Sequence, residues 1–412
     1  NKRKSFIESF SDKYYLTVFD DWVFTDDYAN DILTRHFNTN SLKGFGVDDF
    51  PKGIIAAGAA IHYLHETQHD KISYISSLSR IDQGQFVWLD KFTIRNLELL
   101  HSANANAKTL IDIIDKTSSP MGSRLMRRWL SLPLKNREQI MSRYEIVDFF
   151  VNNNEHISNF QDSIRQVGDL ERLISKVSLL RVNPRELLQV ARALDHIENI
   201  KNLCAESNND ALKLYAEQLN VCDSIRQRIK RTLNPDSPAV ISKGNIINEG
   251  VDEQLDNLRT LSRSGKDYLT DIQRREVAAT GISSLKIGYN NVFGYYLEVT
   301  NLHKDKVPAE WIRKQTLANA ERYITEELKE YEQKILGADE KIQAIEEQLY
   351  LELINACGEF VAPIQLDASL IAKIDCLVSF AHVAVKNNYV MPKIDDSYVI
   401  DIKEGRHPVI EQ

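Results

Sequence analysis

The chain has 412 residues, enough for two or three domains that each bury a core of their own. Its hydrophobic content of 43% and its charged content of 27% are ordinary for a globular protein. We see no apolar run long enough to span a bilayer. The formal net charge of −8 excludes a surface that is basic throughout, so any contact with nucleic acid must be local.

The cysteines indicate the cellular compartment, and the first residue indicates how much of the gene product the sequence covers. No two cysteines form a C-x-x-C pair and their density is too low for a disulfide scaffold, so we expect reduced thiols and a cytoplasmic location. The chain begins at Asn1 and its first methionine is Met121, which predicts a longer gene product. The cysteines are Cys204, Cys222, Cys357 and Cys376.

The first 88 residues have the pattern of an incomplete α/β domain. Residues 14–24 are aromatic and β-branched, which predicts a strand, and residues 53–67 are small and apolar, which predicts a packed helix. Residues 85–90 predict a short closing strand. Because these elements are too few for a complete sheet, we interpret them as the end of a domain that begins upstream.

Three histidines share one face of the predicted helix. His62, His65 and His69 have the spacing i, i+3, i+7, which is compatible with zinc. No cysteine or other fourth ligand lies nearby in the sequence. We therefore expect no metal site.

Residues 91–235 have a helical pattern. Ser119 followed by Pro120 is typical of a helix start. Residues 170–190 and 212–233 predict further helices. Three arginines on the first of these helices are expected to form salt bridges with neighbouring helices rather than to bind DNA. They are Arg124, Arg127 and Arg128.

Residues 251–350 predict two long helices that pair with one another. In the second helix, apolar residues recur at alternating spacings of three and four from Leu328 to Leu349, which is the pattern of a coiled-coil seam. The first helix repeats this pattern, but its seam weakens where Ser262 and Gly265 take the apolar positions. At roughly 1.5 Å per residue, each helix would be about 40 Å long.

A β-rich insertion is predicted between these two helices. Residues 284–290 and 292–300 alternate with a period of two around Asn290 and Asn291. Asparagine tolerates positive φ, so the sequence predicts a tight hairpin here. Because the helices can pair antiparallel, the insertion must lie at the far end of a long arm.

Charge is distributed unevenly along this arm. Residues 281–325 hold six basic and four acidic residues, a sum of +2, whereas residues 326–352 hold three basic and nine acidic residues, a sum of −6. A positive end on a negative arm is what contact with DNA phosphates needs. A surplus of two charges also fits an ordinary solvated surface, so charge alone leaves both interpretations open.

The end of the chain changes character. Residues 370–385 predict a further apolar helix, and residues 398–402 (YVIDI) predict a strand. The segment 405–408 (GRHP) follows. We interpret this stretch as the opening of another domain.

Several segments resemble the MutS family of mismatch-recognition proteins. The likeness is strongest at residues 288–298 (GYNNVFGYYLE) and 313–332 (RKQTLANAERYITEELKEYE). The matching segments follow the family's order over nearly the whole chain. The other segments are residues 89–100, 119–134, 168–188 and 404–412.

The resemblance implies a mainly α fold with α/β and β parts. Its components are a helical core, long antiparallel lever helices with an inserted β-rich clamp, and a partial α/β connector before them. It assigns residues 1–88 to the end of the connector domain and 89–265 and 326–389 to the core and lever. It assigns residues 266–325 to the clamp and 390–412 to the beginning of the ATPase domain.

The resemblance also implies what this stretch lacks. The family's mismatch-reading domain and its phosphate-binding G-x-x-x-x-G-K-[ST] loop are not in the sequence, and the nearest text, residues 264–267 (SGKD), lacks the first glycine and the hydroxyl. We therefore expect no cofactor in this fragment, and ATP with Mg²⁺ only in a full-length parent. The partners implied for that parent are mismatched double-stranded DNA, a second copy of the chain and a MutL-type repair protein, with no membrane.

By similarity, five residues of the clamp are candidates for contact with DNA phosphates. Asn290 also fits a residue needed only for its turn. Arg313 and Lys314 also fit plain solvated charges, and Asn319 also fits a cap at the start of the lever helix. The five are Lys286, Asn290, Arg313, Lys314 and Asn319.

Three neighbouring residues are expected to be structural. Gly294 fits a bulge or a close approach of the backbone better than a contact with DNA. Tyr295 and Tyr296 fit one buried and one surface ring, because stacking platforms suit single strands.

Two alternative functions remain open from the sequence. One is a family paralogue that acts on recombination intermediates. The other is a structural coiled-coil hinge protein, in which the insertion would mediate dimerisation. An enzymatic role is weakest, since we find no convergent acid/base pair, nucleophile or metal set in the sequence.

Overall fold

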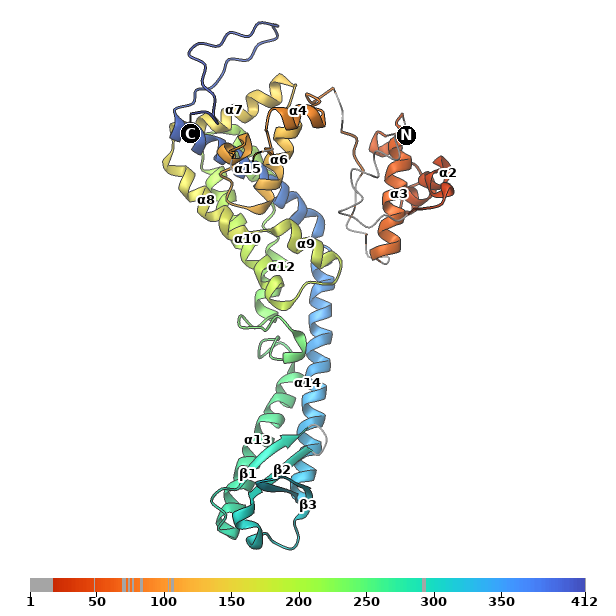
Figure 1. Ribbon diagram of the computed structural model, residues 1–412, viewed down its shortest axis with the longest axis vertical. Coiled ribbons are helices and arrows are strands. Elements are labelled where there is room, and N and C mark those ends of the chain that lie inside the picture. The colour runs from red at the N-terminus through yellow and green to blue at the C-terminus, as the bar shows by residue number, and fades with distance from the viewer. Residues whose placement is uncertain are drawn as a thin grey trace. The chain divides into compact units, whose positions relative to one another are not determined.

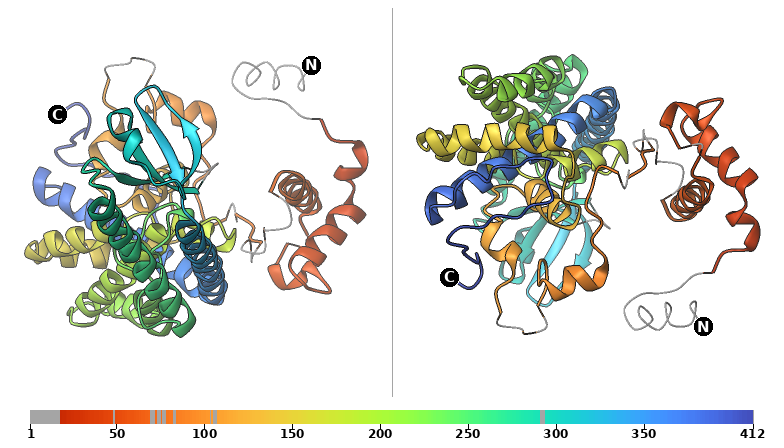
Figure 2. Two further views of the ribbon diagram at one scale, coloured as in Figure 1. Left: turned by 90° about the horizontal axis from the view of Figure 1, so that it is seen from below. Right: turned by 90° about the horizontal axis from the view of Figure 1, so that it is seen from above.

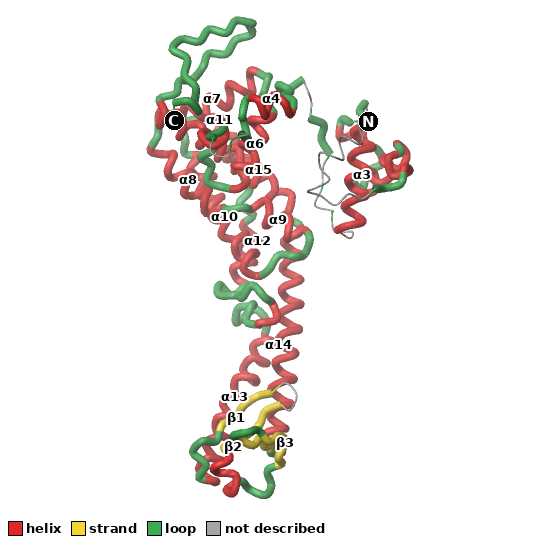
Figure 3. The backbone as a smooth tube through the Cα atoms, viewed as in Figure 1, coloured by secondary structure: helices red, strands yellow, loops and turns green. Residues whose placement is uncertain are grey.

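The computed structural model describes residues 18–47, 49–68, 72, 75, 78–81, 84–102, 104, 107–290 and 294–411. Within them the chain is mostly helical, with one four-stranded antiparallel sheet, so the predicted mainly α class is confirmed (Figures 1 and 3). The chain divides into two compact units, which are described separately. Unit 1 comprises Asn1–Arg181, Arg192–Cys222 and Phe360–Gln412, and unit 2 comprises Val182–Ala191 and Asp223–Glu359.

The elements follow the chain in order, with η denoting a 3-10 helix. Unit 1 holds η1 (Asp21–Phe24), α2 (Asp26–His36), η2 (Leu42–Phe45), α3 (Pro51–Gln68), α4 (Lys91–Asn96), α5 (Leu110–Ile114), α6 (Pro120–Ser131), α7 (Arg137–Asn152), α8 (Glu155–Val167), α9 (Leu170–Ser178), α11 (Asp210–Gln218) and α15 (Val361–Asn387). Unit 2 holds α12 (Asp223–Thr232), η3 (Ile241–Lys243), α13 (Glu253–Thr280), β1 (Lys286–Asn290), β2 (Gly294–Thr300), η4 (Asn301–Lys306), β3 (Ile312–Thr316), β4 (Ala320–Ile324) and α14 (Glu326–Gly358). Helix α10 (Pro184–Ala205) belongs in part to each.

The segment around α2 and α3 has a small core of its own. The two helices cross closely at Gly58, where a Cβ would lie 2.7 Å from the Cα of Ala29. The strand predicted for residues 14–24 is wrong where it can be seen, because Asp21–Phe24 forms η1 and residues 14–17 lie outside the described residues. The buried core residues are Ala29, Leu33, Leu42, Val47, Ile54, Ile61 and Ile72.

The histidines of α3 have structural partners. His62 Nδ1 lies 2.7 Å from the hydroxyl of Tyr28. Among the described residues no group of three or more potential ligands could hold a metal ion, and His69 lies outside them.

The helices α5 to α9, α11 and α15 of unit 1 form a body that we call the helical body. Within it α15 packs against α6, α7, α8 and α9. Asp375 of α15 accepts hydrogen bonds from the N–H groups of Ser118 and Ser119 at 2.8 and 2.9 Å and from the Ser119 hydroxyl at 2.7 Å. The same hydroxyl accepts the N–H of Gly122 at 3.0 Å, so the predicted helix start is confirmed.

The composition of α15 differs from our expectation. It is the one helix among the described residues that is long and apolar enough to cross a membrane, which we had not expected. However, 67% of that stretch is buried inside the protein. Asp367 and Asp375 are fully buried along it, so α15 is the core helix of the helical body.

Two further strand predictions are wrong. Residues 85–90 contain only an isolated bridge between Phe86 and Leu134. Residues 398–402 form no strand, and their apolar side chains are exposed. A strand needs a neighbour to pair with, and a local pattern cannot show whether one is present.

Helices α13 and α14 and the sheet of unit 2 form what we call the arm. The helices are capped where they begin: Asp252 accepts the N–H of Leu255 at 2.7 Å, and Thr325 accepts that of Leu328 at 3.1 Å. The predicted seam is confirmed for the first part of α14, where Leu328, Ile335 and Ala338 are buried. Farther along α14 the prediction was wrong, because Ile342 and Leu349 are only half-buried while Glu346 is buried. Figures 1 and 2 show the two helices side by side with the sheet at one end of them.

Candidate nucleic-acid interface

The sheet at the end of the arm has an inner and an outer face. Its strand order is β1-β2-β4-β3, antiparallel throughout, so β1 and β3 are its edges. On the inner face Leu297, Val299 and Tyr323 share a core with Leu269 and Leu328 of the helices. Because successive strand residues point to opposite faces, the alternate residues form an outer face.

A polar row crosses the outer face. Arg322 Nε donates to Glu298 at 3.0 Å and its Nη1 donates to Gln315 at 2.9 Å. The Arg322 guanidinium also lies 4.2 Å from the centroid of the Tyr296 ring. The strand register aligns the members of the row, one on each strand. They are Lys286, Glu298, Arg322 and Gln315.

One end of the sheet consists of two connected loops. Asn301 donates its backbone N–H to the carbonyl of Asn319 at 3.1 Å and its side-chain amide to that of Ala318 at 2.9 Å. The hydroxyls of Ser284 and Thr300 lie 3.2 Å apart, so β1 begins at this end. We call this end, formed by η4 and residues 317–319, the loop end.

Three of the five predicted residues lie toward the loop end. Lys286 is exposed near the start of β1, and Asn319 is exposed in the connection between β3 and β4. Lys314 is exposed on the edge strand β3, at a bulge in its pairing with β4. These side chains are accessible to a large ligand at the surface of the arm.

Arg313 lies on the inner side of β3, since it pairs across the strands with Tyr323. Its Nη1 forms an ion pair with Glu321 at 3.1 Å, and Glu321 also accepts the hydroxyl of Tyr323. That hydrogen bond and Arg313 hold the pKa of Glu321 below its usual range. Burial, with the same hydrogen bond, raises the pKa of Tyr323 to about 12. The charge of Arg313 is thus balanced within the sheet.

Asn290 lies at the opposite end of the sheet from the loops. The predicted hairpin is present, but Asn290 is a strand residue paired with Gly294, and the positive φ of 77° falls on Gly294. Residues 291–293 lie outside the described residues. The structure therefore does not bring Asn290 together with Lys286 and Asn319.

The close approach predicted at Gly294 is confirmed. A Cβ there would overlap the carboxylate of Glu332 on α14, and this carboxylate accepts the N–H of Tyr295 at 3.3 Å. Tyr296 is buried, as expected for one of the two tyrosines, and Tyr295 is half-buried against the inner core. The alternative that Asn319 caps α14 is wrong, because Thr325 holds that position.

Two lysines of η4 were missed as site residues. Lys304 and Lys306 are exposed in η4 at the loop end. Among the residues that the structure describes, the ion pairs involve neither of them, nor Lys286 or Lys314. The only signal in the sequence was their contribution to the positive charge of residues 281–325.

The salt bridge expected for Arg124 is confirmed. Its guanidinium donates to Asp169 at 2.7 and 3.0 Å and to Glu171 at 2.7 Å. Hydrogen bonding to Asp169 leads the causes that raise the pKa of Arg124. This arginine therefore binds within the helical body.

Family models identify the class of this protein. The model of MutS domain III matches residues 92–381, and that of MutS domain II matches residues 11–76. The chain belongs to the MutS family. This assignment excludes the coiled-coil hinge protein that the sequence had left open.

Curated relatives carry the same family name. The chain is 56% identical to DNA mismatch repair protein MutS of Flavobacterium psychrophilum over 99% of its length and 47% of the relative's. It is 54% identical to the protein of that name from Flavobacterium johnsoniae, over 100% of this chain and 48% of the relative. It is 53% identical to the protein of that name from Bacteroides fragilis, over 100% of this chain and 48% of the relative. The chain thus spans about half the length of the curated relatives it matches.

Proposed function

We propose that this chain is part of a DNA mismatch repair protein and that its arm contacts duplex DNA through the phosphate backbone. The observation that carries the proposal is the loop end. Exposed lysines without ion-pair partners among the described residues gather there with Asn301 and Asn319, on an arm whose helix α14 is acidic. Lysine and amide groups bind phosphate without reading sequence.

The relatives support mismatch repair rather than processing of recombination intermediates. Each relative reported above is named a DNA mismatch repair protein and matches 99% or more of this chain. We infer that recognition of the mismatch and the hydrolysis of ATP with Mg²⁺ reside in parts of such a protein that lie outside this sequence. Pairing with a second copy and with a MutL-type partner belongs to the same proposal.

A charge-removal variant tests the contact with DNA. Replacing Lys286, Lys304 and Lys314 with alanine should weaken binding of a short duplex equally for matched and mismatched sequences. The slope of log affinity against log salt should flatten by up to about three units, roughly one for each phosphate that a lysine no longer neutralises. Fluorescence anisotropy of a labelled duplex, titrated at several salt concentrations, measures both quantities.

A matched variant controls for net charge. Lys135, Lys213 and Lys341 are also exposed but lie on other surfaces, and their replacement with alanine changes the net charge equally. Binding by this control should match the unmodified chain. Equal losses of affinity in the two variants, or a loss confined to mismatched duplex, would contradict the proposed interface.

A further inference from the structure

The sheet and the adjoining halves of the two helices form one packed body. Leu269 of α13 and Leu328 and Ile335 of α14 share a core with the inner face of the sheet. Against this core, Tyr268 stacks on Tyr331 with ring centroids 4.0 Å apart. We call this unit the sheet body. Its continuous apolar packing makes it the stiff part of the arm.

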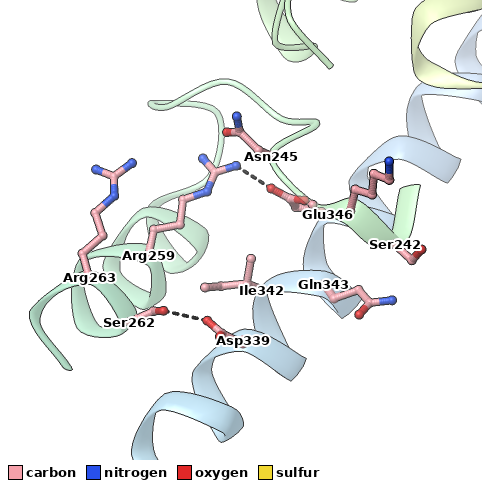
Figure 4. A pocket seen from close by; sticks show the side chains of 11 residues that line it. Ser242, Asn245, Arg259, Ser262, Arg263, Asp339, Ile342, Gln343 and Glu346 are labelled. Carbon is pink, nitrogen blue, oxygen red and sulfur yellow. Dashed lines mark hydrogen bonds and ion pairs between the residues drawn. The ribbon is translucent and has the colours of Figure 1, made fainter. Parts of the chain in front are cut away.

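A polar layer replaces the apolar seam beyond the sheet body. Ser262 donates to Asp339 at 2.6 Å, and Arg259 donates to Glu346 at 2.6 Å (Figure 4). Glu346 is 1% exposed and the Arg259 side chain 11%. Desolvation offsets most of the attraction in a buried ion pair, so this layer holds the helices together less firmly than leucine would.

The polar layer lines a cavity of about 420 Å³. Its walls come from α13, α14 and residues 242–245, which include two successive residues with positive φ, Gly244 (68°) and Asn245 (60°). Within the described part of the chain, Glu346 Oε2 is buried without a hydrogen-bond partner. The cavity mixes cationic and anionic side chains, so it selects no class of ligand. The cavity instead shows that the two helices are not packed side chain against side chain along this face of the polar layer.

Each helix has a glycine between the sheet body and the polar layer. Gly265 of α13 and Gly337 of α14 occupy these positions. Glycine weakens a helix relative to alanine because it gains more freedom when the helix opens. A Cβ at Gly337 would meet nothing within 4 Å, so close packing does not require a glycine there.

We propose that Gly265, Gly337 and the polar layer form a bending point of the arm. The sheet body tilts about this point as a unit, and each helix remains regular on either side. Weak packing lowers the cost of separating the helices locally, and the glycines lower the cost of curving them. The proposal concerns the arm itself and does not require that the sheet bind DNA.

Distances between spin labels test the bending. One label pair, at cysteines replacing Thr316 and Gln348, spans the proposed point, and a second pair, replacing Thr316 and Arg274, lies within the sheet body. The four native thiols are buried, which raises the pKa of each and keeps them unlabelled. We expect a broad distance distribution across the point and a narrow one within the sheet body.

The Gly337→Ala variant should narrow most of the distance distribution that is measured across the proposed bending point. The weight of bent conformers across the point should fall about fivefold, which is the preference of a helix for alanine over glycine. Gly358→Ala is the matched control, because Gly358 is also in α14 with open space around it but lies outside the proposed point. It should leave the distribution unchanged.

A second variant tests the polar layer independently of the glycines. Replacing Arg259 with methionine and Glu346 with leucine together fills the layer with apolar side chains, and it should also narrow the distribution. A single narrow distance in the unmodified chain overturns the proposal. So does a distribution that Gly337→Ala leaves unchanged, or a broad one within the sheet body.

Discussion

The helical body and the outer face of the sheet use polar side chains in opposite ways. In the helical body, Asp375 is fully buried and satisfies three donors at the start of α6. On the arm, Arg322 and Lys286 lie on an outer face, paired with neighbours on the sheet or exposed. The comparison teaches that buried polar groups stabilise the fold in the helical body, whereas on the outer face of the sheet polar side chains lie near the surface.

The largest expected loss of stability comes from removing the buried carboxylate of Asp375 in the helical body. Asp375→Ala leaves the N–H groups of Ser118 and Ser119 without their acceptor in a buried position, so stability should fall by about 3 kcal/mol or more. Urea unfolding followed by circular dichroism measures the change. Asp162→Ala, at an exposed carboxylate on α8, serves as the control and should cost under about 0.5 kcal/mol. Similar losses of stability in the Asp375→Ala and Asp162→Ala variants would contradict the special role of the buried carboxylate.

A second buried carboxylate makes the helical body sensitive to pH. Burial raises the pKa of Asp367 to about 7, although its hydrogen bond from the N–H of Asn220 and the charge of Lys201 oppose the shift. The native state therefore holds this proton more tightly than the unfolded state. The contribution of Asp367 to stability is complete below about pH 4 and is lost as the pH rises through 7.

The Asp367→Asn variant isolates this effect. Asparagine cannot ionise, so the variant should gain roughly 4 kcal/mol over the unmodified chain at pH 8, at about 1.4 kcal/mol for each pKa unit. At pH 4 the two should be about equally stable. Unfolding midpoints at several pH values provide the measurement, and parallel pH profiles would show that Asp367 does not titrate.

Replacing two glycines of the arm with alanine should change its stability in opposite directions. Gly294→Ala forces a side chain into a positive φ and against Glu332, so the arm should lose about 1–2 kcal/mol. Gly337→Ala adds a methyl group to open space in a helix and should gain about 0.5–1 kcal/mol. Hydrogen exchange of the arm's amides reports both changes locally. Destabilisation of equal size in both variants would mean that Gly337 is needed for packing.

Local patterns predicted the parts of this fold that local forces determine. The start of α6, the first part of the seam along α14 and the hairpin between β1 and β2 follow from capping, heptad spacing and alternation. Residues 398–402 were also predicted as a strand from their β-forming residues, but they lack a neighbouring strand, so the prediction there was wrong. A pattern specifies what a segment can form, and its neighbours decide whether it does.

The candidate site was predicted less completely, because its partners come from the strand register. Glu321 balances Arg313 and Glu298 holds Arg322 only because β4 lies between β2 and β3. The bond between Asp375 and Ser119 joins residues 256 positions apart, which no local pattern can show. The charge count located the region around Lys304 without separating paired from exposed cations.

The smallest expected effect concerns the polar row on the outer face. Arg322 bonds Glu298 near solvent, where hydration and salt offset most of the attraction. In a double-mutant cycle with Arg322→Ala and Glu298→Ala, the coupling energy should be about 0.5 kcal/mol and should shrink as salt is added. Urea unfolding at low and high ionic strength gives both values. A coupling near that of a buried pair would mean that the outer face, like the helical body, is built to hold the fold, and the contrast between the two regions would disappear.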